Sequence, residues 1–155
     1  MLPSEALNRI NTHRLILNLP QIQLSYLEWN QGQEPLLLLH GLADCGMVWV
    51  SLAELLRDRY HILVPDLRGH GDSSKPAQGY SYADIIADLE ALMDRVGWAS
   101  AHVVAHSWSA KVAAIWARQL PQRFRSMVLV DPFFINTMPS WMKLTFRLSI
   151  ECYHS

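Results

Sequence analysis

The chain has 155 residues, of which 50% are hydrophobic and 17% are charged, and its formal net charge is −1. A chain of this size and composition can bury a sizeable apolar core and is expected to be globular. The near-neutral charge and scattered lysines and arginines give no reason to expect a nucleic-acid partner. No stretch reaches the roughly 18 apolar residues of a membrane-spanning helix, so no membrane association is expected.

The two cysteines, Cys45 and Cys152, lie far apart in the chain and have no metal-ligand spacing. This usage suits a reducing compartment. Met1 to Asn30 carries polar residues throughout and lacks the apolar segment of a signal peptide. We therefore expect a cytoplasmic protein.

Short apolar runs alternate with helical patterns along the chain. Strands are predicted at 13–18, 21–29, 36–39, 61–64, 102–105 and 127–130. Helices are predicted around 49–56, from Ser81 to Gly97 with Asp84 completing the cap, and from the end of the fifth strand to Pro121. The run 36–39 is apolar on both faces, as in a central parallel strand. The alternation predicts an α/β fold, with a mostly parallel sheet flanked by helices.

Ser107 stands where the predicted strand 102–105 passes almost directly into a helix. Small residues, Ala105 and Ser109, lie two positions away on each side. This is the layout of a nucleophile elbow, G-x-S-x-G, in which a strained turn exposes the serine Oγ while strand and helix pass closely. Ser107 is therefore a candidate nucleophile; the alternative is a serine that simply caps a helix.

Both flanking glycines of the usual elbow are replaced here, although Ala110 keeps the next position small. Ser109 adds a Cβ and a hydroxyl where the helix crosses the strand, so we expect a tighter elbow. Changing Ala105 and Ser109 to glycine in a complete catalytic domain is then expected to be neutral or stabilising. Crowding in a packed contact costs about 1–3 kcal/mol, whereas glycine in a regular element costs about 0.5–1 kcal/mol.

Two further loops follow predicted strands, at the sheet edge where open α/β sheets bind ligands. In the first, Gly41 permits a sharp turn after His40, and the amide of Leu42 is then placed to point into the site. The second, residues 65–74, has the glycines and short polar side chains of a tight, internally hydrogen-bonded loop. A metal site built from Asp66, His70 and Asp72 is the less favoured alternative, because these residues match no ligand motif.

The order and spacing of these three motifs resemble the α/β-hydrolase superfamily, most closely its esterase-like and epoxide-hydrolase-like branch. Residues 127–132 resemble the strand after the elbow helix, and residues 133–142 resemble the entry to the family's helical cap. The resemblance implies that residues 1–132 form the N-terminal part of the hydrolase core. Residues 133–155 would begin a cap, in a fold truncated after about the sixth strand.

The resemblance implies that Ser107 attacks an acyl carbon and that the backbone amides of Leu42 and Trp108 form the oxyanion hole. Epoxide hydrolases and haloalkane dehalogenases of the family place Asp at the elbow. Serine there favours hydrolysis of an ester, thioester, lactone or C–C bond, and lyase or perhydrolase chemistry stays open. His40, Trp108 and Trp141 are candidate walls of the substrate pocket.

The resemblance also implies an acid and then a histidine after the nucleophile. Asp131 is the candidate acid, with a loop cap as its alternative role. No histidine matches the family's base: His106 adjoins Ser107 but is expected to point elsewhere, and His154 lies next to the last residue. His40 and His70 are expected to be structural. A serine without a base is a weak nucleophile at neutral pH.

The sequence therefore predicts part of a serine hydrolase for a small ester-like molecule, without metal or organic cofactor, and inactive as this chain. The alternative is a non-catalytic remnant or a binding module. The strand 127–130 is expected to be an exposed apolar edge. Such edges template pairing, so we expect self-association or binding of a missing C-terminal half there.

Overall fold

The computed structural model describes residues 12–132 of the chain. Six strands form one sheet in the order β1-β2-β4-β3-β5-β6. They are β1 (His13–Asn18), β2 (Gln23–Trp29), β3 (Glu34–Leu39), β4 (Tyr60–Pro65), β5 (Ala101–His106) and β6 (Phe124–Val130). β1 and β2 pair antiparallel with each other and β2 pairs antiparallel with β4, whereas β4, β3, β5 and β6 are parallel. The predicted α/β class and mostly parallel sheet are confirmed.

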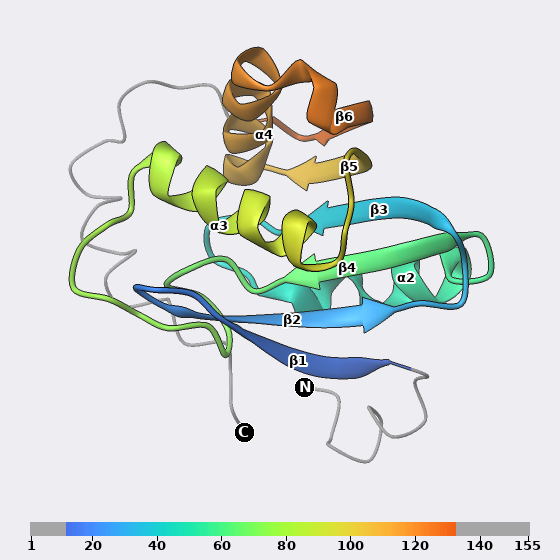
Figure 1. Cartoon of the computed structure of the whole chain (residues 1–155), viewed down its shortest axis with the longest axis horizontal. Coiled ribbons are helices and arrows are strands. Elements are labelled where there is room, and N and C mark those ends of the chain that lie inside the picture. Colours follow the sequence, from blue (N-terminus) through green and yellow to red (C-terminus); the bar gives the residue numbers. More distant parts are fainter. Residues whose placement is uncertain (1–11, 133–155) are drawn as a thin grey trace.

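Helices cover both faces of this sheet, as Figure 1 shows with α3 and α4 on one side and α2 on the other. They are α2 (Val50–Leu56), α3 (Tyr82–Arg95) and α4 (Trp108–Gln119), with short 3-10 turns η1 (Gly46–Trp49) and η2 (Pro121–Arg123). The three predicted helices are all present. Ser81 caps α3 in a reciprocal pair with Asp84, and Gly97 follows its end with φ of 77°.

The core lies in two layers, one on each face of the sheet. Leu37 and Leu39 of β3 face the larger layer beneath α3 and α4, whereas Leu36 and Leu38 face the smaller layer beneath α2. The apolar run on both faces therefore belongs to a central strand, as the sequence predicts. None of the described helices is long and apolar enough to cross a membrane.

The strand β6 stands at one end of the strand order, and its side chains are more exposed than those of its neighbour β5. Among residues 12–132 it pairs with β5 alone, and it begins at Phe124, earlier than predicted, because the pairing extends back to Ala101. Its side chains Met127, Val128 and Val130 are 37%, 52% and 39% exposed. Of the two predicted domains, the cap at 133–155 lies outside the described residues.

Candidate active site

Ser107 occupies a strained turn between β5 and α4. Its φ of 55° and ψ of −116° lie where residues other than glycine are rare, and such conformations cost about 1–3 kcal/mol. The surrounding backbone holds the turn, since the Ser107 amide donates to the Val130 carbonyl at 2.9 Å and its carbonyl accepts from the Ala110 amide at 3.1 Å. The side chain makes no capping hydrogen bond. Ser107 therefore does not act as an ordinary helix cap, and its geometry is that of an elbow.

Ser109 lies where α4 crosses the sheet, and its hydroxyl bonds backbone groups of the strands there. The residue is fully buried, and its Oγ accepts from the His106 amide at 3.1 Å. The same oxygen lies 3.0 Å from the Leu39 carbonyl of β3 and 2.9 Å from the His106 carbonyl. The position that usually holds glycine here carries a polar cross-link between α4, β5 and β3. This argues against the expected gain on replacing it with glycine.

The loop after β3 lies directly against the elbow. A Cβ placed on Gly41 would be 3.5 Å from the Ser107 Cβ and 3.0 Å from Nδ1 of His106. The second distance is tighter than ordinary packing, so glycine here allows the close approach. The backbone at Gly41 is thus adjacent to the predicted nucleophile, as an oxyanion loop requires.

His40 anchors this loop to its neighbour after β4. The ring is fully buried; Nδ1 lies 2.7 Å from the Gly41 carbonyl and Nε2 accepts from the Leu67 amide at 3.0 Å. Burial lowers the pKa of His40 to about 4, so the ring is neutral at neutral pH. With both nitrogens bonded to backbone, His40 has the contacts of the structural role expected for it, and its place in the pocket wall stays a prediction.

Asp66 organises the second loop. Its side chain is 1% exposed and accepts from Arg14 of β1 at 2.6 Å, from the Gly46 amide at 2.7 Å and from the Asp72 amide at 3.0 Å. A Cβ on Gly71, whose φ is 49°, would lie 2.3 Å from the Asp66 Cγ. The carboxylate is fully used by protein donors. Within the part of the chain that the structure describes, no group of His, Cys, Asp and Glu could hold a metal ion.

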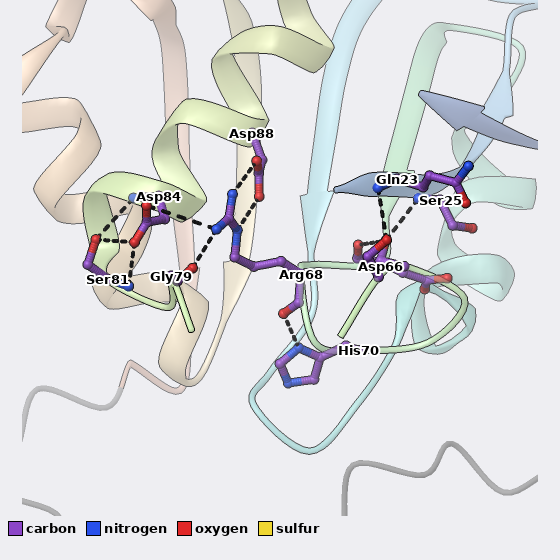
Figure 2. Close-up of polar contacts among 11 residues, drawn as sticks. Gln23, Ser25, Asp66, Arg68, His70, Gly79, Ser81, Asp84 and Asp88 are labelled. Carbon is purple, nitrogen blue, oxygen red and sulfur yellow. Dashed lines mark hydrogen bonds and ion pairs between the residues drawn. The ribbon is translucent and has the colours of Figure 1, made fainter. Parts of the chain in front are cut away.

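Arg68 ties the same loop to helix α3, as Figure 2 shows. Its Nε and one terminal nitrogen bond the two carboxylate oxygens of Asp88 at 2.6 and 2.7 Å, and it also donates to the Gly79 carbonyl. The hydrogen bond to Asp88 raises the pKa of this buried arginine. Neither this pair nor Arg14–Asp66 has a local sequence signal, because the partners lie 20 and 52 residues apart.

His70 closes the contact between the two loops. It is 6% exposed, Nδ1 lies 3.0 Å from the Arg68 carbonyl (Figure 2), and Nε2 contacts the Leu42 carbonyl. The loops 40–44 and 66–74 are therefore cross-linked by two histidines. The tight, hydrogen-bonded loop predicted at 65–74 is present.

Two further predicted site residues, Trp108 and Asp131, belong to the described part of the chain. Trp108 opens α4, and its ring stacks on Tyr82 of α3, with centroids 6.0 Å apart and an interplanar angle of 28°. Asp131 is exposed and follows Val130, the residue whose carbonyl bonds the nucleophile's amide. Trp141 and His154 lie outside the described residues.

A family model described as the alpha/beta hydrolase fold matches residues 34–148, which is well over half of the chain. The chain belongs to the α/β-hydrolase fold family. This α/β-hydrolase chain is 36% identical over 111 residues to a dihydrolipoyllysine-residue acetyltransferase component of an acetoin cleaving system from Cupriavidus necator. That match covers 72% of the chain and 30% of the relative.

Hydrolases are also among the relatives of this α/β-hydrolase chain. A soluble epoxide hydrolase from Corynebacterium sp. is 30% identical over 129 residues, covering 83% of the chain and 42% of the relative. The crystal structure of a haloalkane dehalogenase loop variant from Bradyrhizobium elkanii superposes with a TM-score of 0.73 at 30% identity, covering 84% of the chain and 43% of that structure. The chain thus spans less than half the length of these relatives.

Proposed function

We propose that this α/β-hydrolase chain carries the nucleophile and oxyanion hole of a serine hydrolase acting on a small, fairly apolar ester-like substrate. The observation that carries the proposal is the strained Ser107, placed against the backbone of Gly41. The hydrolase names among the relatives support the reaction class. Serine at the elbow, where epoxide hydrolases and dehalogenases of the family use Asp, favours an acyl over an alkyl intermediate.

The proposed reaction proceeds through an acyl-enzyme. The Ser107 Oγ attacks the carbonyl carbon, a base takes its proton, and the amides of Leu42 and Trp108 stabilise the oxyanion. Collapse breaks the ester bond and releases the alcohol after protonation. Water then hydrolyses the acyl-serine, which releases the acid and restores Ser107.

The base is proposed to come from outside residues 12–132. Among the described histidines, His40 and His70 contact backbone carbonyls or amides, and His61 and His102 lie 2.7 Å from Glu28 and Ser126. His13 lies on β1, at the opposite edge of the sheet from β6. His106 packs against Gly41, and Asp131 remains a candidate acid. This part of the chain is therefore proposed to be inactive alone.

Ester turnover tests the proposal directly. The purified 155-residue chain should turn over p-nitrophenyl esters feebly or not at all. Any activity should disappear in Ser107→Ala and persist in the matched control Ser51→Ala, which changes an exposed serine of α2. Robust turnover that depends on Ser107 would contradict the proposal of an external base, and His106 and His40 would be tested first as recruited bases.

A non-catalytic binding role is the second candidate. It is favoured by the exposed apolar side chains of β6, which offer a surface to a second copy or to a separate C-terminal half. The two functions differ in one outcome. Activity of the chain mixed with its partner requires Ser107 only if the chain contributes the nucleophile.

A further inference from the structure

Both ring nitrogens of His70 face backbone carbonyl oxygens, and within residues 12–132 neither nitrogen receives a hydrogen bond from a donor. Nδ1 faces the Arg68 carbonyl at 3.0 Å and Nε2 faces the Leu42 carbonyl, while the ring itself is 6% exposed. A carbonyl oxygen accepts hydrogen bonds and cannot donate them. Each of the two contacts therefore requires a proton on the histidine.

A neutral imidazole carries one N–H, whereas the imidazolium carries two. We propose that His70 is a positioning residue that acts as an imidazolium and, by holding the Leu42 carbonyl, fixes the oxyanion loop beside Ser107. The inference rests on the proposed function, because it assigns a purpose to the placement of the Leu42 amide. His70 itself touches no reacting atom.

His40 supplies the complementary contact from the neighbouring peptide. Its Nδ1 bonds the Gly41 carbonyl, which belongs to the same peptide group as the Leu42 amide. In a trans peptide the carbonyl and the N–H point in opposite directions, so a bond that fixes the first also aims the second. His40 bonds the carbonyl of the peptide before Leu42, and His70 bonds the carbonyl of the peptide after it. The loop is therefore anchored at two consecutive carbonyls, those of Gly41 and Leu42.

The two rings make this arrangement electrostatically compatible. They meet edge to face with centroids 5.1 Å apart. His40 accepts a hydrogen bond from the Leu67 amide at Nε2 and is therefore neutral, so the pair carries one positive charge rather than two. Besides His70, the titratable groups within residues 12–132 that act on His40 are Asp66, whose carboxylate is bonded by Arg14, and His106. The charge of Arg68 is directed to Asp88.

The two contacts of His70 cannot both form with a single ring proton. A neutral ring could donate to the Leu42 carbonyl or to the Arg68 carbonyl, but not to both. Loss of the contact at Leu42 would free the loop at its second anchor, while the His40 anchor would persist.

Nitrogen NMR of the full chain with ¹⁵N-labelled histidine rings tests this inference. At about pH 6, both ring nitrogens of His70 should resonate as protonated, whereas His40 should show one protonated and one unprotonated nitrogen. The Leu42 carbonyl ¹³C signal should shift in His70→Gln and stay unchanged in His102→Gln. If the chain associates or precipitates, solid-state NMR reads the same signals.

The His70→Gln variant assigns the His70 signals, and His102→Gln is the matched control on a partly exposed ring. An unprotonated nitrogen on His70 at about pH 6 would overturn the proposal. So would a Leu42 carbonyl signal that is the same in His70→Gln as in the parent chain. The measurement involves no catalysis, so failure of Ser107 to react would leave this result intact, and the reverse also holds.

Discussion

The loops after β3 and β4 and the outer strand β6 belong to the same sheet, but they differ in how many buried contacts fix them in place. The loops are buried and cross-linked through Asp66, Arg68, His40 and His70, with partners on β1, α3 and each other. In contrast, β6 bonds to β5 on one side and leaves three apolar side chains exposed. The difference indicates that the geometry around Ser107 is set by contacts within residues 12–132. The outer sheet edge is proposed to need a further surface.

Removing the Asp66 carboxylate should have the largest effect. In Asp66→Ala, Arg14 and the amides of Gly46 and Asp72 lose a buried acceptor, so the free energy of unfolding should fall by about 3–5 kcal/mol. Urea denaturation measures the change. The exposed control Asp58→Ala, whose side chain is 97% exposed, should stay within about 0.5 kcal/mol of the parent. Equal effects of the two variants would mean that the loop network does not stabilise the fold.

Acid should weaken the same region through His40. Burial lowers its folded-state pKa to about 4, below the ordinary value of 6.5, so the unfolded chain binds the proton first as pH falls. This contribution is fully present above about pH 6.5 and is lost towards pH 4, to a total of about 3 kcal/mol. Denaturation between these pH values measures it. His40→Gln should flatten the dependence, and His102→Gln should leave it unchanged; an unaltered slope in His40→Gln would refute the assignment.

Ser109→Gly should lower the free energy of unfolding by about 1–3 kcal/mol, because the part-buried His106 amide and the buried Leu39 carbonyl lose their hydroxyl partner. This reverses the expectation from the sequence, in which relief of crowding dominates. Thermal denaturation distinguishes the two, with Ser51→Ala as the exposed control. A melting temperature that is unchanged or raised would show that crowding outweighs the hydrogen bonds.

A substitution on the exposed face of β6 should have the smallest effect on the free energy of unfolding. Its main effect should be on self-association. We propose that the isolated chain associates through this edge, so Val128→Lys, at a side chain that is 52% exposed, should reduce association. Its free energy of unfolding should change by no more than about 0.5 kcal/mol. Size-exclusion chromatography with light scattering measures the mass. A monodisperse 17.7 kDa parent with a sharp melt would contradict the proposed role of this edge.

The strands and helices were predictable because their signals are local. The apolar run 36–39, the Ser81 cap and the strand-to-helix turn at Ser107 each depend on a few neighbouring residues, and each is present in the structure. The loop contacts were not predictable in this way. Arg14 reaches Asp66, and Arg68 reaches Asp88, only after the sheet has formed.

Ser109 shows a different limit of sequence-based prediction. Its size indicates crowding where glycine is usual, but its effect depends on whether carbonyls lie within reach of the hydroxyl. Two of them do, from β3 and from β5. The sequence pattern shows how large each side chain is. It does not show which backbone groups the packing of distant strands brings within hydrogen-bond distance.

The site of covalent modification tests the central claim most directly. The purified chain is incubated at length with a serine-directed fluorophosphonate, and the modified peptide is identified by mass spectrometry. We predict that the modification, although slow without a base, lies on Ser107, disappears in Ser107→Ala and persists in Ser51→Ala. Modification of other serines at the same rate as Ser107, or none at Ser107 when the proposed partner half is supplied, would contradict its role as the nucleophile.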